Sequence, residues 1–291
     1  MSVKVIIDNT DISAVYGLEL GEGSIASLIQ WAALKEPYIN DWHEEDGVEP
    51  DLSNPVLDTR NCTLSFVGNA TLAQVDDFVA LWSGGAYHKL NIYTPIKTAF
   101  EYNLRLVKCN SVEWLDDFVI VKMTFADDAP FTISERPSSN LAPDARYRIP
   151  SGYLSTFGVR VLDGAHRELL NAGDVKPNAM QSLDNEAGVV YDGAEVRFKP
   201  IEVRIPCLMR ADSLSELYNN YYALLSKLIA KGGIWLAAAP LGKRYYCYYV
   251  SQHVRRAYFD SPIWVEFDIT LCVYTKPVNI STYDLEYIQQ E

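Results

Sequence analysis

An acidic stretch between Asp41 and Asp51 holds the densest group of side chains that could do chemistry. Carboxylate oxygens are the ligands that Ca²⁺ prefers. If Gly47 took the turn position of a helix-loop-helix calcium site, Trp42 would stand where the first carboxylate ligand is required, so that motif is excluded. A looser calcium site and a solvated or subunit-contacting loop both stay open. The candidate contact residues are Trp42, His43, Glu44, Glu45 and Asp46.

The other acidic and nucleophilic residues form no catalytic pattern. Adjacent carboxylates occur at 76–77, 116–117 and 127–128, but sequence neighbours do not face each other across a bond, as glycoside hydrolysis requires. The four histidines are scattered, no serine lies in a Gly-x-Ser-x-Gly elbow, and no glycine-rich phosphate loop occurs. The sequence therefore predicts a protein that is not an enzyme and holds neither a cofactor nor a catalytic metal.

The cysteines all lie on predicted strands and form no Cys-x-x-Cys pair. This pattern favours small buried apolar residues in a reducing compartment over a metal or redox role. They are Cys62, Cys109, Cys207, Cys247 and Cys272.

One predicted strand carries aromatic rings on both faces. In a strand with one face in solvent, apolar and polar residues would normally alternate. Either both faces are covered within the domain or one face meets another subunit, and a sugar-stacking surface is a third option. The candidate interface aromatics are Tyr245, Tyr246, Tyr248 and Tyr249.

Composition bounds the class of protein. Among 291 residues, 48% are hydrophobic and 22% are charged, which is typical of a globular chain. The net charge of −13 argues against a phosphate-gripping surface, because such a surface gathers Lys and Arg. The longest apolar runs, such as 234–241, are far shorter than the roughly 20 residues of a membrane-spanning helix.

The predicted secondary-structure elements that position these residues occur twice in the same order, at 61–125 and at 201–271. Each copy shows an alternating strand, a helix, a Gly-Gly break, another strand and a long hairpin. Thr71 and Ser213 open the two helices. The second strand of the first hairpin can be aligned with the sequence 146 positions further along. In this alignment its four inward residues all match apolar residues. They are Val119, Val121, Met123 and Phe125. Such agreement in polarity without identity indicates an old duplication.

The repeat predicts domains at 1–133 and 153–275, a Pro-rich linker at 134–152 and a tail at 276–291. We expect two strands within 3–20, a helix from Ser24 to Leu34, and irregular loops at 35–55 and 167–191 that stay outside the core. Residues 156–161 echo 15–20 at the start of the second copy. In the tail, packing on a neighbour and mobility stay open for Tyr283, Leu285, Tyr287 and Ile288.

This plan resembles the tail-tube fold shared by phage tail-tube, distal tail and baseplate hub proteins and by type VI secretion tubes. The likeness covers 15–125 and 157–271, and the strand at 60–66 with its helix and Gly-Gly stop is nearest to distal tail proteins. The expected fold class is α+β, mainly β. It comprises two tandem tail-tube-like β-sandwich or split-barrel domains, each with one packed helix and a long hairpin.

The resemblance implies a structural protein of a phage or prophage tail that forms a ring around a lumen. The implied partners are copies of the chain, as a trimer or hexamer, and other tail proteins, with DNA passing without specific binding and no membrane. The implied location is the virion tail, assembled in the bacterial cytoplasm. Two tube-like domains suggest a hub in which three chains supply six domains, whereas distal tail proteins usually have one, so stoichiometry stays open.

A protein of another class also fits the sequence. Six Trp, nineteen Tyr and acidic loops suit a two-domain carbohydrate-binding module. An enzyme of unknown type comes third, and would need carboxylates with raised pKa values in one pocket.

Overall fold

The computed structural model describes residues 4–93, 99–130, 136–177, 180–185, 187–259 and 262–280. The protein is α+β and mainly β, as the sequence predicts. The chain divides into two compact units. Unit 1 comprises Met1–Ala33, Leu57–Phe131 and His253–Phe259, and unit 2 comprises Leu34–Val56, Thr132–Gln252 and Asp260–Glu291. No described helix is long and apolar enough to cross a membrane.

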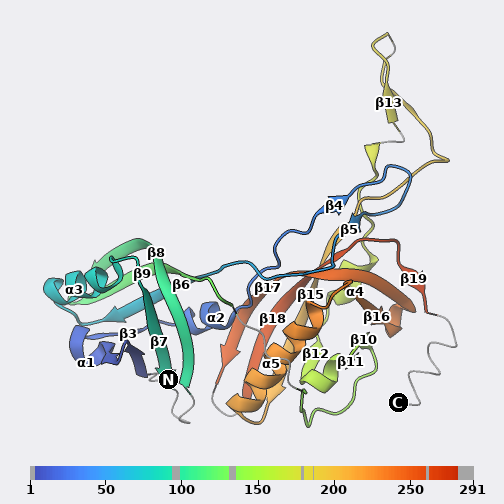
Figure 1. Ribbon diagram of the computed structural model, residues 1–291. Coiled ribbons are helices and arrows are strands. Elements are labelled where there is room, and N and C mark those ends of the chain that lie inside the picture. The colour runs from blue at the N-terminus through green and yellow to red at the C-terminus, as the bar shows by residue number, and fades with distance from the viewer. Residues whose placement is uncertain are drawn as a thin grey trace. The chain divides into compact units, whose positions relative to one another are not determined.

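The first sheet has seven antiparallel strands in the order β2-β1-β7-β8-β9-β6-β3 (Figure 1). Its strands are β1 (Lys4–Ile7), β2 (Thr10–Asp11), β3 (Leu18–Leu20), β6 (Arg60–Gly68), β7 (Tyr87–Tyr93), β8 (Ala99–Leu115) and β9 (Phe118–Asp127). Three helices accompany it, α1 (Ile12–Tyr16), α2 (Ser24–Ile29) and α3 (Leu72–Trp82).

The second sheet has the order β11-β10-β16-β17-β18-β15-β12, and β19 pairs with β17 outside this path. Its strands are β10 (Tyr147–Ile149), β11 (Gly152–Tyr153), β12 (Val159–Val161), β15 (Ile201–Ala211), β16 (Ile234–Ala238), β17 (Lys243–Tyr258), β18 (Ile263–Val273) and β19 (Val278–Asn279). The helical segments are η1 (Leu154–Phe157), α4 (Ala165–Leu170), α5 (Leu214–Leu228) and η3 (Ala239–Leu241). The described residues also form two small hairpins, β4 (Ile39–Asn40) with β5 (Glu49–Pro50) and β13 (Met180–Ser182) with β14 (Val189–Tyr191).

The two sheets share one topology. Strand by strand, β1 to β3 correspond to β10 to β12, β6 to β15, and β7 to β9 correspond to β16 to β18. Phe125 of β9 pairs with Cys62 of β6. Leu271 of β18, which is 146 positions after Phe125, pairs with Val203 of β15, which is 141 positions after Cys62, so the offset differs between the two strands. An ancestral duplication that produced this match stays our proposal.

Burial of alternating residues explains why the hairpin strands form. The four predicted inward residues of β9 are all fully buried. The equivalent residues of β18, 146 positions further along, are at most 3% exposed. At the predicted helix starts, the Thr71 hydroxyl accepts from the Gln74 backbone N–H at 3.3 Å, and the Ser213 hydroxyl accepts from the Glu216 backbone N–H at 3.1 Å. Both caps satisfy backbone donors that a helix start leaves unpaired.

The start of the chain differs from our expectation in two ways. A short helix, α1, stands within 3–20, because the Asp11 carboxylate accepts from the backbone N–H groups of Ser13 and Ala14. Helix α2 ends at Ile29 and does not reach Leu34, since Gln30 has an extended backbone with ψ of 134°.

The irregular segments hold more structure than the sequence suggests. Strand β10 lies within the expected linker 134–152 and pairs with β16, so this part belongs to the second sheet. The expectation that loop 35–55 stays outside the core is wrong at Leu52, which is 5% exposed and packs with Tyr248 and Cys272. The tail residues that could meet a neighbour lie in 281–291, outside the described residues.

Candidate functional site

The predicted contact loop lies in unit 2 and forms the small hairpin β4–β5. The Trp42 side chain is 52% exposed, and its indole N–H donates to Glu49 Oε2 at 3.1 Å. His43, Glu44 and Glu45 are exposed, whereas Asp46 is half-buried. The loop therefore presents an aromatic ring and two carboxylates at the surface, which suits contact with a partner.

A buried lysine anchors this loop. Lys176 is 1% exposed, and its ammonium donates to Asp41 Oδ1 at 2.6 Å and to the Trp42 carbonyl at 2.8 Å. Because an unpaired buried ammonium is costly, these two acceptors fix Lys176 and the loop together. Lys176 comes from the irregular segment of the second copy, between α4 and β13.

Three further bonds join the same two segments. The Gly47 N–H donates to the Phe198 carbonyl at 2.7 Å, and the Phe198 N–H donates to Asp46 Oδ1 at 2.9 Å. Arg197 Nε donates to the Glu44 carbonyl at 2.6 Å. The long loops of the two copies, at 34–56 and 171–200, thus form one structure, which we call the loop pair.

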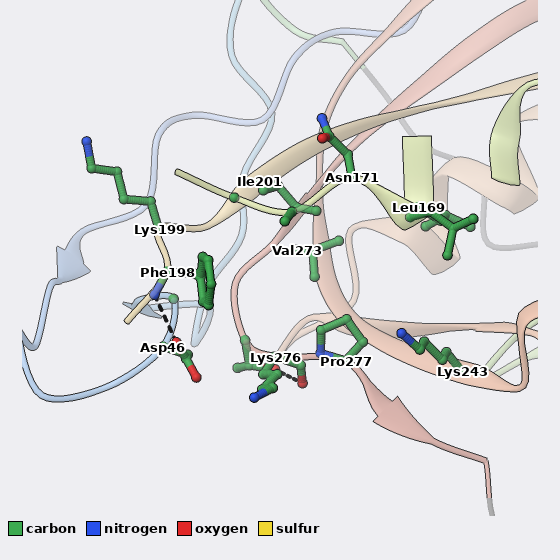
Figure 2. Close-up of a pocket in the computed structure, with 15 residues that line it drawn as sticks. Asp46, Leu169, Asn171, Phe198, Lys199, Ile201, Lys243, Val273, Lys276 and Pro277 are labelled. Atoms are coloured by element: carbon green, nitrogen blue, oxygen red, sulfur yellow. Dashed lines mark hydrogen bonds between the residues drawn. The ribbon is translucent and has the colours of Figure 1, made fainter. Parts of the chain in front are cut away.

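A pocket of about 230 Å³ opens beside the loop pair (Figure 2). Leu169, Ile201 and Val273 give it an apolar lining, and Lys243 and Lys276 add ammonium groups. Its volume is below the roughly 300–1,000 Å³ of pockets that enclose small-molecule ligands. Its size suits an apolar side chain better than a substrate.

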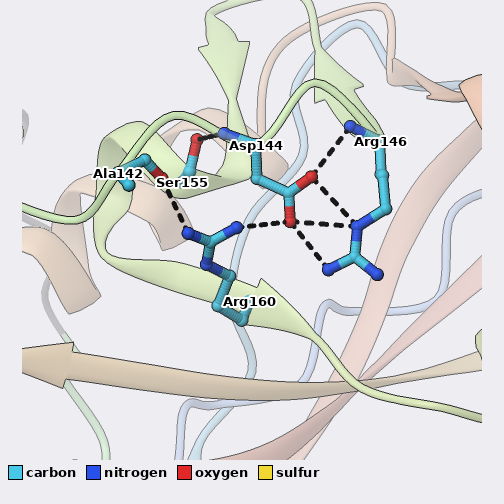
Figure 3. Close-up of polar contacts among 5 residues, drawn as sticks. All are labelled: Ala142, Asp144, Arg146, Ser155 and Arg160. Carbon is cyan, nitrogen blue, oxygen red and sulfur yellow. Dashed lines mark hydrogen bonds and ion pairs between the residues drawn. The ribbon is translucent and has the colours of Figure 1, made fainter.

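A half-buried carboxylate, that of Asp144, fixes the start of the second copy (Figure 3). Asp144 pairs with Arg146 and Arg160, each at 2.8 Å, and Arg160 also donates to the Ala142 carbonyl at 2.8 Å. Hydrogen bonds from Arg146, followed by those from Arg160, hold the pKa of Asp144 well below its usual range. This cluster orders part of the segment that we expected to be linker, and shows a structural role.

The adjacent carboxylates at the end of β9 also have hydrogen-bond partners. Asp127 accepts from Arg60 at 2.6 Å, and Asp128 accepts from Arg105 and from the Tyr87 hydroxyl. The bond from Arg105 holds the pKa of Asp128 well below its usual range, so this carboxylate is a poor general acid. Among the residues that the structure describes, no three His, Cys, Asp or Glu side chains gather closely enough to hold a metal ion.

Three of the four candidate tyrosines on β17 are buried. Tyr245 and Tyr249 are fully buried, and Tyr248 is 8% exposed and packs with Leu52. Tyr246 alone of the four is half-buried. Three of the four side chains are therefore covered in the folded chain, and the interface role suggested by the sequence stays a prediction for these tyrosines.

Four cysteines are buried as expected, but Cys109 is exposed. Burial raises the pKa of the Cys62 thiol to about 11, which keeps it protonated and unreactive at neutral pH. Cys109 lies on β8 beyond Arg105, where the pairing of β8 with β7 ends. Its alternation pattern on the strand gave no signal of this difference.

Sequence reasoning missed Lys176 and Arg197, the side chains that hold the loop pair together. Both stand in a segment without hydrophobic period, and their partners are more than 130 positions away. One indication of this contact is present in the sequence: the loop at 34–56 is acidic, and the loop at 171–200 contains isolated Lys and Arg residues.

No protein-family model matches the sequence, and no curated protein matches it. Among solved structures, the chain is similar to Dit of SPP1, described as a paradigm of the hub adsorption apparatus in phages that infect Gram-positive bacteria. The identity is 10%, the match covers 57% of this chain and 71% of that one, and the TM-score is 0.34. The function of this chain has to be inferred from its own sheets and loops.

Proposed function

We propose that this chain is a structural, non-enzymatic component of a phage or prophage tail, of distal tail or baseplate hub type, that assembles into a ring. The observation that carries the proposal is the presence of two sheets with the same strand order in one chain. A chain with two equivalent units suits a closed ring, because every unit can offer its neighbour the same kind of surface.

The sheets also offer edges for assembly. Within the described residues, β2 and β3 end the first sheet and β11 and β12 end the second. Unpaired edge strands present N–H and C=O groups to another chain. Sheets of neighbouring subunits that join at such edges would enclose a lumen.

Charge is compatible with a conduit for DNA. A net charge of −13 opposes adhesion of phosphates to the wall, so DNA would pass without specific binding. The loop pair, with Trp42, Glu44 and Glu45 exposed, is our candidate for contact with other tail proteins or with an adjacent ring.

Mass photometry and electron microscopy of the purified chain test this proposal. We expect particles with the mass of three or six chains of 32.8 kDa and a central lumen. The same chain should be present in purified tail particles. A strictly monomeric protein at tens of micromolar that is also absent from tails would contradict the proposal.

The carbohydrate-binding alternative keeps one supporting observation, the exposure of Tyr38 (74%) and Trp42 (52%) on the same loop. Glycan-array binding that disappears in Tyr38→Ala and Trp42→Ala, in a chain that stays monomeric, would favour this alternative over a ring.

A further inference from the structure

The pocket beside the loop pair combines an exposed apolar lining with cations at its border. Leu170, which lines it, is 61% exposed, and Phe198 is 37% exposed. Lys243 and Lys276 lie along one border of the pocket, whereas the Lys199 side chain points away from it (Figure 2). Apolar surface left in water favours a cover, because its burial stabilises by about 25 cal/mol per Å².

The two border lysines are open to an acidic partner. Among the residues that the structure describes, neither Lys243 nor Lys276 forms an ion pair with a carboxylate. Asp46 also lines the pocket, but its Oδ1 already accepts from the Phe198 N–H at 2.9 Å. The pocket therefore suits an apolar side chain that has a carboxylate next to it.

Residues 281–291 of the same chain have this chemistry. They contain three carboxylates and neither Lys nor Arg. Apolar and acidic residues alternate from Tyr283 to Tyr287, so each apolar side chain there has a carboxylate beside it in the sequence. The three carboxylates are those of Asp284, Glu286 and Glu291.

This segment follows directly on a strand that is anchored at the pocket. Strand β19 pairs with β17, with Asn279 opposite Lys243, and the Ile280 N–H donates to the Gly242 carbonyl at 2.8 Å. An extended chain spans about 3.3–3.6 Å per residue, so a few residues after Ile280 exceed the width of a pocket of about 230 Å³. A short tether also gives the segment an effective concentration in the millimolar range.

We propose that residues 281–291 cover this pocket of their own chain. An apolar side chain of the segment enters the pocket, and an adjoining carboxylate pairs with Lys243 or Lys276. Opposite charges at the border favour this arrangement, and the apolar side chain removes the lining from water. The segment and the pocket both belong to unit 2, so the docking does not depend on ring assembly.

Hydrogen exchange of the 291-residue chain, followed by mass spectrometry, tests this docking. In Lys243→Glu/Lys276→Glu two attractions become repulsions, so we expect exchange in 281–291 to be about tenfold faster than in the wild type. The segment has the same sequence in both proteins, so its intrinsic exchange rate is unchanged. Lys231→Glu is the matched control, because Lys231 is exposed in the same unit and does not line the pocket. Circular dichroism checks that each variant is folded.

A charge swap tests the pairing itself. Asp284→Lys/Glu286→Lys should lose the slow exchange of the segment, because the segment then carries cations toward Lys243 and Lys276. Adding Lys243→Glu/Lys276→Glu to this variant should restore slow exchange. The two proteins of this comparison again share one segment sequence, so a difference in exchange reports docking.

The outcomes separate this docking from the ring. Equal exchange of 281–291 in the wild type and in Lys243→Glu/Lys276→Glu would overturn the docking. Protection that grows with protein concentration would show that the segment binds another chain, and would overturn docking within one chain. Equal loss of protection in Lys231→Glu would also overturn it. A chain that never assembles but protects 281–291 would leave the docking standing and count against the ring.

Discussion

At the scale of single residues, arginine–carboxylate pairs fix segments that have no regular structure of their own. Asp144 is the clearest case, since its side chain is 11% exposed and contacts two guanidinium groups. Its ion pairs hold residues around 142–146 against β12 (Figure 3). The same logic applies to Lys176 in the loop pair, where a buried cation joins two distant loops.

The stability that Asp144 contributes should depend on pH. Its pKa is lowered in the folded protein by Arg146, so the contribution is present above the unfolded pKa of about 3.9 and is lost as pH falls through the folded value. We expect Asp144→Asn to lower the free energy of unfolding by about 1 kcal/mol at pH 7, and the difference to shrink below about pH 4.

Urea unfolding at several pH values measures this effect. Asp184→Asn is the control, because Asp184 lies in the exposed turn after β13. A difference for Asp144→Asn that stays constant down to the lowest accessible pH would show that the carboxylate acts through packing and not through its charge.

At the scale of elements, one glycine ends the same short helical turn in both copies. Gly17 follows α1 with φ of +65°, and Gly158 follows η1 with φ of +73°. A Cβ at Gly17 would lie 2.8 Å from the Asn69 carbonyl oxygen, and a Cβ at Gly158 would lie 2.7 Å from that of Arg210. Both positions therefore need a left-handed backbone and a close approach to the neighbouring strand.

Alanine at these two positions tests the equivalence of the units. Gly17→Ala and Gly158→Ala should each destabilise their unit by at least about 1 kcal/mol, since an L-residue is strained there and its Cβ collides with a backbone carbonyl. Thermal unfolding measures the loss. Gly84→Ala should be nearly neutral, because a Cβ at Gly84 meets nothing within 4 Å. If Gly17→Ala lowers the unfolding temperature and Gly158→Ala does not, the two positions are not equivalent.

At the scale of the whole molecule, net charge and apolar surface act in opposite directions on assembly. Each chain carries −13, so copies repel one another at long range. Exposed apolar side chains such as Trp114 and Leu115 would offer short-range contacts that salt does not weaken. The Debye length falls from about 10 Å at 0.1 M to about 3 Å at 1 M ionic strength.

Assembly should therefore strengthen with salt. We expect the concentration for half assembly, measured by sedimentation velocity, to fall as sodium chloride rises over this range, because screening removes repulsion between chains. The Trp114→Glu variant should keep the direction of this dependence with weaker assembly throughout. Assembly that weakens with salt would indicate that ion pairs, and not an apolar surface, join the chains.

Much of the fold was accessible from the sequence because it follows local periods. The alternation in β9 and β18 and the caps at Thr71 and Ser213 depend on neighbours a few positions apart, and the structure agrees with them. The boundaries of α2 and the strand β10 were missed, since short elements carry too few residues for a period to show.

What the sequence by itself determined is a repeated strand, helix and hairpin in an acidic, mainly β protein, because core burial selects polarity and spacing over a few residues. Only the tertiary structure decided which loops meet, that Lys176 is buried beneath one of them, and that Tyr245 and Tyr249 are covered. The physical reason is distance along the chain. Contacts between residues more than a hundred positions apart leave no periodic trace, and whether a side chain is covered depends on the segment that packs against it.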